Sequence, residues 1–501
     1  MNNCEDDFPT LDINFDWDFK IKTLWFNLSR KSVISEIREL FNSILELSLS
    51  DNIKQTFIKR LILYIRDIGS GKGEQLLSYM MLFELYGLFP DEAYGILELF
   101  LTKYGSWRDV PYMCDYISKT SSRDHKFINI IVTMMNDRLY LDMKKAENNE
   151  PISNAAKWVP REGSKFTWLF NLLLDNWTLR YHPYLFRTSK TPEQRTKARC
   201  KAAAIYRKVF TLLSSKLGLV EVKLCNGIEF FDIDPLMINK KTMSKQWHSS
   251  YDMNFDSHDN LYHNKNITSI KIRYPMKWLV NASVRSPILI QNNNINSLWQ
   301  NMISDKKLGS FIPMIDISSS VFKTGNIQSI IGNAMMIAKH STIGLRISFL
   351  GNEPLWYNRG ELLDDDYLSL LKDISNFLPH FSISNIIEGI KQLLGSIVSC
   401  NMNSDDISKL HLVIFTDQGF SSMIHHEIES LFHNKGLTVP RIIYWNISDK
   451  FVDIDSGLFI KDPFFLSGND PSNFDALFQI SKSNTCFSQY ELIHLIVSRY
   501  H

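Results

Sequence analysis

The chain has 501 residues, of which 44% are hydrophobic and 22% are charged. This composition predicts two or three folded domains and argues against a chain that is disordered throughout. Because 55 basic residues are balanced by 54 acidic ones, for a formal net charge of +1, any nucleic-acid-binding surface has to be a local patch.

The sequence carries no sign of secretion or membrane insertion. Its first residues, Met1–Asp7, are polar and acidic, unlike a signal peptide. No apolar run reaches the roughly 18 residues that span a bilayer. The six cysteines are scattered without a C-x-x-C pair, which favours reduced thiols. We expect a cytoplasmic protein with no membrane-embedded part.

The first part of the chain has the apolar rhythm of helices. Between Leu24 and Leu217, apolar residues recur every three or four positions, which predicts an array of amphipathic helices, as in solenoids of helix pairs. The array shows no strict sequence period. The expected helices lie near 33–45, 57–64, 76–86, 93–103, 127–143, 166–179 and 197–217. The stretch 226–305 is looser and rich in Asn, Asp and Ser, which predicts an irregular joining segment.

After Gly309, short apolar strands alternate with helices. Expected strands are 311–316, 345–350, 410–415, 441–445 and 464–466, and expected helices are 327–340, 366–377, 386–399, 422–434 and 471–480. This alternation predicts a doubly wound, mainly parallel α/β domain with helices on both faces of the sheet. The fold class is therefore an α-helical region followed by an α/β domain. In such sheets, ligands bind at the carboxyl ends of the strands, where the strand order reverses.

Oxygen-bearing side chains follow two of these strands. The first strand runs into Asp316, Ser318 and Ser320, and a later strand runs into Asp417. Between them, Ser384 precedes a helix, where it is either another ligand or a plain helix cap. Hard oxygens of this kind suit Mg²⁺ or Mn²⁺. The competing interpretation is that a strand-end Asp followed by serines simply caps the next helix.

A basic segment with neighbouring aromatic residues precedes the irregular stretch. Tyr184, Phe186 and Tyr206 accompany its basic side chains, and the single acid is Glu193. The pattern fits capture of a phosphate backbone with base stacking, although most such runs are solvated helix faces. The candidate RNA-binding residues are Arg187, Lys190, Arg195, Lys197, Arg199, Lys201, Arg207 and Lys208.

Catalytic signatures are missing from the sequence. The stretch Gly69–Gly73 lacks the first glycine and the Ser/Thr of a nucleotide-binding loop. It predicts a tight turn between helices, in which Lys72 could contact a phosphate without forming a nucleotide site. No zinc-binding histidine pattern and no nucleophile elbow is present. We therefore expect a protein that is not an enzyme.

The Asp-x-Ser-x-Ser stretch resembles the metal-ion-dependent adhesion site of von Willebrand factor A domains. This resemblance implies a site of Asp316, Ser318, Ser320, Ser384 and Asp417. Two positions depart from the family pattern. Ser384 stands where the family usually has Thr, which preserves the hydroxyl. Thr-Asp-Gln-Gly replaces the usual Thr/Ser-Asp-Gly, so the carboxylate remains but the turn differs.

Four ordered motifs of the helical region carry a second resemblance. Residues 66–74, 104–109, 157–160 and 206–208 are similar to the TROVE-related helical region that precedes a von Willebrand A domain in a family of unknown function from plants, fungi and large DNA viruses. The resemblance implies a TROVE-like, HEAT-like helical domain at 20–305 and a von Willebrand A-like domain at 306–501. The many Asn and Ile residues are compatible with a viral source, which would imply association with the virion.

The better-understood relatives of that family are the Ro autoantigen proteins, which bind small non-coding and misfolded RNAs and are not enzymes. The resemblance therefore implies a ribonucleoprotein component whose RNA contacts include the basic segment, Lys72 and Arg108. The alternative is an adaptor whose metal ion, held by Asp316, captures a carboxylate of a protein partner.

Overall fold

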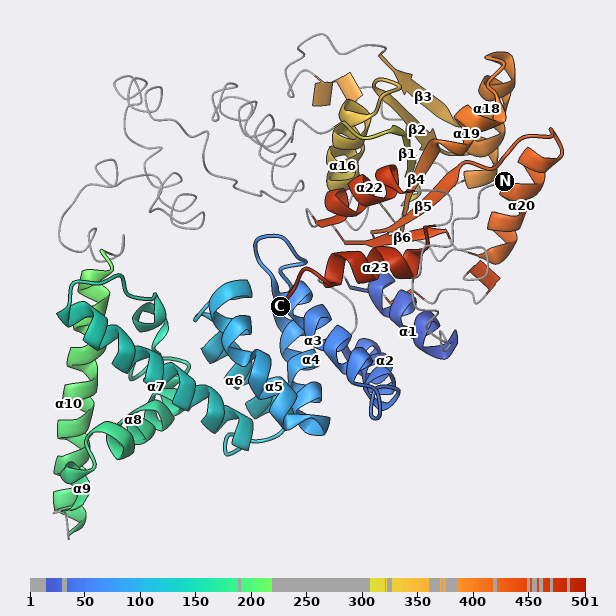
Figure 1. The fold of residues 1–501 in the computed structure, drawn as a ribbon. Coiled ribbons are helices and arrows are strands. Elements are labelled where there is room, and N and C mark those ends of the chain that lie inside the picture. The colour runs from blue at the N-terminus through green and yellow to red at the C-terminus, as the bar shows by residue number, and fades with distance from the viewer. Residues whose placement is uncertain are drawn as a thin grey trace, which may run out of the picture. The chain divides into compact units, whose positions relative to one another are not determined.

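The computed structural model describes residues 15–28, 34–187, 191–218, 307–319, 327–359, 385–417, 421–447, 463–468, 472–483 and 487–501, with a few residues between them. They form two compact units (Figure 1): residues 1–93 with 270–501, and residues 94–269. This division differs from the predicted boundary near 305, because the first four helices belong with the α/β region. The predicted joining segment lies outside the described residues.

A six-stranded sheet forms the centre of the first unit. Its strands are β1 (Ser310–Asp316), β2 (Arg346–Leu350), β3 (Leu355–Asn358), β4 (Leu410–Thr416), β5 (Arg441–Asn446) and β6 (Phe464–Ser467). The order is β3-β2-β1-β4-β5-β6, and only β3 runs antiparallel to its neighbour. The five predicted strands are confirmed; β3 was not predicted. β1 and β4 are buried along almost their whole length, as parallel strands covered on both faces must be.

The strand order reverses between β1 and β4. The chain passes from β1 to β2 on one side of the sheet and returns to β4 on the other. The carboxyl ends of β1 and β4 therefore flank the switch point, which is where doubly wound sheets bind ligands.

Helices cover both faces of this sheet (Figure 1). α16 (Ile327–His340) and α22 (Ser472–Lys482) lie on one face, and α18 (Ile386–Ser399), α19 (Ser404–Ser408) and α20 (Ser422–His433) lie on the other. Ile390 and Phe432 pack with Met314 of β1 in one buried core. A Cβ at Gly389 would lie 2.4 Å from Leu350 Cδ2, so α18 packs closely on the sheet. The predicted helix at 366–377 lies mostly outside the described residues.

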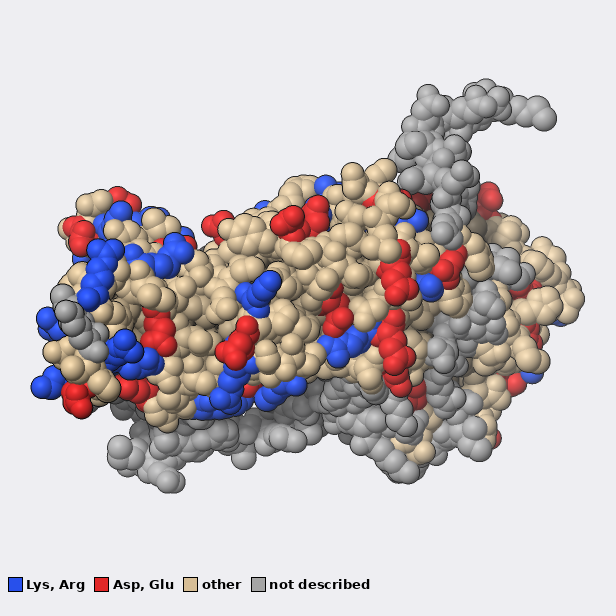
Figure 2. Space-filling view, turned by 90° about the horizontal axis from the view of Figure 1, so that it is seen from below, with Lys and Arg blue, Asp and Glu red and all other residues tan. Residues whose placement is uncertain are grey.

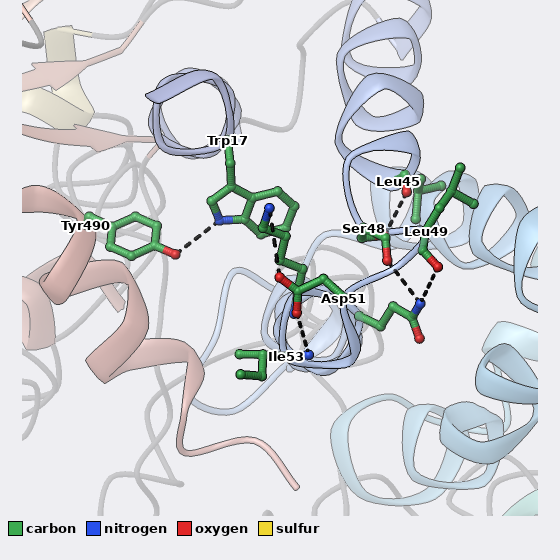
Figure 3. Close-up of polar contacts among 9 residues, drawn as sticks. Trp17, Leu45, Ser48, Leu49, Asp51, Ile53 and Tyr490 are labelled. Carbon is green, nitrogen blue, oxygen red and sulfur yellow. Dashed lines mark hydrogen bonds and ion pairs between the residues drawn. The ribbon is translucent and has the colours of Figure 1, made fainter. Parts of the chain in front are cut away.

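The first helices of the chain pack against its last elements. They are α1 (Phe15–Phe26), α2 (Ile34–Glu46), α3 (Asn52–Arg66) and α4 (Gln75–Leu88), and the last is α23 (Gln489–Val497). The Trp17 indole N–H donates to Tyr490 Oη at 3.0 Å (Figure 3). Phe26 packs edge-on against Phe465 of β6. These contacts tie the start of the chain to the sheet.

Capping defines where α3 begins. The Asp51 carboxylate accepts hydrogen bonds from the backbone N–H groups of Ile53 and Lys54 (Figure 3). These are two of the donors that a helix start leaves without partners. The Lys54 ammonium lies 5.1 Å from the centre of the Trp17 ring. The same turn therefore starts α3 and holds α1 against it.

The second unit is helical. It contains most of α5 (Pro90–Leu99), the π-helical turn η1 (Phe100–Tyr104), α6 (Asp109–Thr120), α7 (Lys126–Glu147), the 3₁₀ turn η2 (Ala155–Trp158), α8 (Thr167–Tyr181), α9 (Tyr184–Arg187) and α10 (Pro192–Lys216). The predicted helices are present, and α6 and the short α9 are additional. None of the described helices is long and apolar enough to cross a membrane.

A glycine permits the tight loop between α3 and α4. In this loop the backbone N–H of Lys72 donates to the Tyr64 carbonyl at 3.1 Å, and that of Glu74 donates to the Ile65 carbonyl at 2.8 Å. The loop therefore folds back onto the last turn of α3. A Cβ at Gly71 would lie 2.0 Å from the Tyr64 carbonyl oxygen, too close for any side chain.

Gly71→Ala is expected to lower the free energy of unfolding by about 1–3 kcal/mol or more, because backbone atoms cannot move aside as a flexible side chain can. Urea unfolding of the full chain measures the loss. Gly69→Ala is the matched control, since the nearest atom to its Cβ would be 3.4 Å away; it should change stability by less than about 1 kcal/mol. Equal effects of the two variants would contradict this account of the loop.

Candidate metal centre and nucleic-acid interface

Asp316 lies at the end of β1 and is only 1% exposed. Its Oδ1 accepts a hydrogen bond from the backbone N–H of Ser318 at 2.8 Å. Its Oδ2 accepts one from the Thr416 hydroxyl at 2.7 Å. The carboxylate is thus held between the loop that follows β1 and the end of β4.

The sheet register explains this contact. Ile315 is paired with Phe415 across β1 and β4, so the next residues, Asp316 and Thr416, lie side by side at the switch point. Asp417 follows directly and is half-buried. The structure therefore brings three of the predicted elements of the site, Asp316, Ser318 and Asp417, to one edge of the sheet.

Two predicted ligands, Ser320 and Ser384, lie outside the described residues. The structure does answer which residue caps α18. The Asn385 side chain accepts a hydrogen bond from the Glu388 backbone N–H at 3.0 Å, so the cap considered for Ser384 belongs to Asn385.

The chemistry of these residues fits a hard divalent cation. Both Asp316 oxygens have neutral donors, and within the described parts of the chain no basic side chain forms an ion pair with Asp316. A buried carboxylate without a cationic partner is costly, and carboxylate and hydroxyl oxygens are the ligands that Mg²⁺ and Mn²⁺ prefer. The described residues contain no cluster of three or more His, Cys, Asp and Glu side chains.

The hydroxyl of Thr416 is a contact that the sequence did not predict. Thr416 was read as the last residue before the carboxylate of Asp417, whereas the structure shows it bound to Asp316. The Thr-Asp pair at the strand end was a visible signal. The direction of its hydroxyl depends on the pairing of β1 with β4 and could not be read from the sequence.

The predicted basic segment forms α9 and α10. Thr191 and Gln194 form a capping box at the start of α10, and Pro192 occupies its first turn, which is a strong helix start. The buried side of α10 is made of small and apolar residues with Tyr206. Figure 2 shows several Lys and Arg side chains, with Asp and Glu side chains among them, on the left of the view, the side on which Figure 1 places α9 and α10.

Three lysines occupy the outer side of α10. Lys197, Lys201 and Lys208 are all exposed, and their spacing of four and seven residues puts them on one side of a helix. No acidic partner of these lysines is found among the described residues.

Two arginines of the same helix are already paired. Arg199 forms an ion pair with Asp175 of α8 at 2.8 Å, and Arg207 forms one with Glu162 at 2.9 Å. All four side chains are about half exposed, so these pairs are weak. Arg187 and Arg195 are exposed, and Lys190 lies outside the described residues.

The aromatic residues of the segment likewise include one that is buried and others that are accessible. Tyr206 is completely buried, and its hydroxyl donates to Asn136 Oδ1 at 2.9 Å, so it cannot stack on a base. Burial raises the pKa of Tyr206 above its usual range. Tyr184 remains 55% exposed, and Phe186 is half-buried.

Lys72 has a structural environment unlike that of a phosphate ligand. Its side chain is 2% exposed, and its ammonium donates to the Ser467 carbonyl at 2.7 Å and to Asn473 Oδ1 at 3.2 Å. It also lies 5.9 Å from the centre of the Trp25 ring. Lys72 is therefore a buried structural residue and not a candidate for contact with RNA. Arg108 is half-buried between the rings of Tyr112 and Trp158.

Comparison with known proteins does not assign the chain to a family. No protein-family model matches the sequence, and no curated protein matches it significantly. The interpretation of the two sites therefore rests on the residues themselves.

Adding Mg²⁺ or Mn²⁺ to chelator-treated protein is expected to raise its melting temperature by a few degrees, because a ligand that binds only the folded state stabilises it. Asp316→Ala should abolish the shift. Asp405→Ala removes an exposed carboxylate of α19 and should leave the shift intact. An identical metal response in the wild type and in Asp316→Ala would exclude this carboxylate as a ligand.

Lys72→Met is expected to lower stability by roughly 1–3 kcal/mol, because the buried Ser467 carbonyl loses a charged donor. Its RNA affinity per folded molecule should stay unchanged. Chemical denaturation and fluorescence anisotropy with labelled RNA separate the two quantities. A variant that is stable but weak in RNA binding would restore Lys72 to the interface.

Proposed function

We propose that this chain is a non-enzymatic RNA-binding protein, a component of a ribonucleoprotein, with a divalent-metal site in its α/β domain. The observation that carries the proposal is the row of exposed lysines Lys197, Lys201 and Lys208 on α10. Like charges on one side of a helix repel each other, and within the described structure no acid compensates them. A phosphate backbone would remove this repulsion and release counterions.

The nearly balanced charge of the whole chain makes this local row of lysines a stronger argument for a binding surface. With a net charge of +1, the protein has no general attraction for nucleic acids. α9 and α10 together carry eight basic side chains and one acid, Glu193, and the exposed Tyr184 adds a ring on which a base can stack. The proposed ligand is RNA, single-stranded or structured, because the resemblance of the helical region to TROVE-related proteins points to that class.

The α/β domain is proposed to be of the von Willebrand A type. Support comes from the strand order with its switch point between β1 and β4 and from the buried Asp316 at that point. Asp316, Ser318, Ser320, Ser384 and Asp417 would hold Mg²⁺ or Mn²⁺. The ion would supply positive charge that orders the loops and an open coordination position for an oxygen ligand.

A second candidate function is that of a protein-interaction adaptor. The observation in its favour is that hydrogen bonds hold Asp316 to the loop after β1 and to the end of β4, which orients the carboxylate before any ligand binds. A carboxylate of a partner protein would then complete the coordination of the metal.

Reversing the three lysine charges (Lys197→Glu, Lys201→Glu and Lys208→Glu together) is expected to weaken RNA binding more than about tenfold at moderate salt. The slope of log affinity against log salt should fall by roughly two. Fluorescence anisotropy across a salt series measures both quantities.

The matched control reverses three exposed lysines of the α/β domain, Lys391, Lys435 and Lys482, and changes the net charge equally. If both triple variants bind RNA alike, attraction is a matter of total charge and α10 is not the interface. Binding of a protein partner that is lost with chelator or with Asp316→Ala, and is indifferent to the α10 reversals, would favour the adaptor.

A further inference from the structure

Two of the ordered sequence motifs meet in the second unit. Arg108 comes from the motif at 104–109, and Trp158 comes from the motif at 157–160. The guanidinium carbon of Arg108 lies 5.5 Å from the ring centre of Trp158 and 5.5 Å from that of Tyr112. Tyr112 also packs edge-on with Phe166, at 5.6 Å between ring centres. We call Arg108, Tyr112, Trp158 and Phe166 the arginine–aromatic cluster.

Several of the described arginines of this unit are paired with an acid, whereas Arg108 is not. Arg180 lies over the Tyr181 ring and is paired with Asp137 at 2.8 Å, and Arg199 is paired with Asp175. Among the described residues Arg108 has no carboxylate partner, and its Nε is buried without a hydrogen-bond acceptor. A guanidinium has five N–H donors and keeps its charge. The part of this half-buried guanidinium that remains accessible can donate to an acceptor of a ligand.

The charges around the cluster are positive on balance. The ammonium of Lys157 lies 5.9 Å from the Trp158 ring centre, and that of Lys165 lies 5.0 Å from the Phe166 ring centre. Three acids belong to the same segments. Asp109, which follows Arg108, is buried and accepts a hydrogen bond from the Ser106 backbone N–H at 2.8 Å, and the other two are ion-paired. Asp115 binds Lys119 at 2.8 Å and Lys165 at 3.4 Å, and Glu162 binds Arg207.

The cluster adjoins the helix proposed to bind RNA. The 3₁₀ turn η2, which carries Lys157 and Trp158, packs against α10. The ion pair between Glu162 and Arg207 joins the segment after η2 to α10. A strand of RNA lying along α10 can therefore reach the cluster within the same unit.

We propose that the arginine–aromatic cluster is a binding site for unpaired bases of single-stranded RNA. An unpaired base stacks on the ring of Tyr112, which is 39% exposed, and the Arg108 guanidinium donates to a neighbouring phosphate. Aromatic rings and guanidinium planes are the usual stacking partners of splayed bases. This inference rests on the proposed function and assigns it a specific contact with the bases, which the lysines of α10 cannot make.

The test compares two short labelled oligomers of equal length, an oligouridylate and its abasic counterpart, which has the same phosphates and no bases. Tyr112→Leu in the full chain is expected to weaken oligouridylate binding at least about fivefold and abasic binding less than twofold. Arg108→Lys should weaken both oligomers, because a phosphate contact needs no base. Tyr94→Leu, at another exposed tyrosine, and Arg180→Lys, at an acid-paired arginine, are the controls and should change neither affinity.

The outcomes separate this proposal from the proposed function. If the α10 charge reversals weaken binding while Tyr112→Leu leaves the difference between the two oligomers unchanged, the cluster is not a base-binding site, although RNA binding stands. If the wild type binds neither oligomer nor structured RNA, the proposed function itself fails. Photocrosslinking of thiouridine-labelled RNA to the wild type gives a readout that needs no variant: crosslinks at Tyr112 or Trp158 support the site, and crosslinks confined to α10 overturn it.

Discussion

The buried ammonium of Lys72 is the interaction on which the first unit depends. A lysine that is 2% exposed is tolerated only if its charge is fully hydrogen-bonded, and here the carbonyl of Ser467 and the side chain of Asn473 provide the acceptors. Ser467 also donates to the Trp25 carbonyl at 2.9 Å. One point at the end of β6 thus joins α1, the loop after α3 and the start of α22.

Neighbouring contacts reinforce this junction. The Trp25 ring stacks on Tyr64 of α3 at 5.1 Å between ring centres, and the Tyr64 hydroxyl is hydrogen-bonded to Ser472 of α22. The Tyr500 hydroxyl donates to the Asp67 carboxylate in the same loop. As a result β6, the last strand of the described sheet, is covered by α1 from the start of the chain, which protects it as an edge strand.

Local patterns predicted most of the elements, although α1, α6, α9, α19 and α23 were missed. They could not predict which elements pack together. Ile327–His340 and Ile386–Ser399 are helices with the predicted bounds, because their apolar periodicity is strong. β3 was missed because it has four residues and is largely exposed. The packing of α1 against β6 and α23 has no local signal, since it depends on contacts such as that of Trp17 with Tyr490, which lie more than 400 residues apart.

The same limit applies to the sites. Asp316 was predictable because a strand ends there, whereas its bond to Thr416 required the sheet register. Lys72 resembled a phosphate ligand because glycines surround it, but its glycines serve a loop that turns the side chain inward. Among the basic residues of α10, the lysines and the paired arginines look alike in sequence. Their difference comes from Asp175 and Glu162, which other segments supply.

The division of the chain has a consequence for its synthesis. Since the first unit is made of residues 1–93 and 270–501, its first helices are translated early and its sheet is translated late. A ribosome delivers the chain from its N-terminus at a limited rate, so residues 94–269 leave it complete while α1–α4 still lack β6 and α23. The second unit is therefore free to fold first. The apolar faces of α1–α4 stay without their final partners until the last helix is released, and until then they are covered by chaperones or by one another.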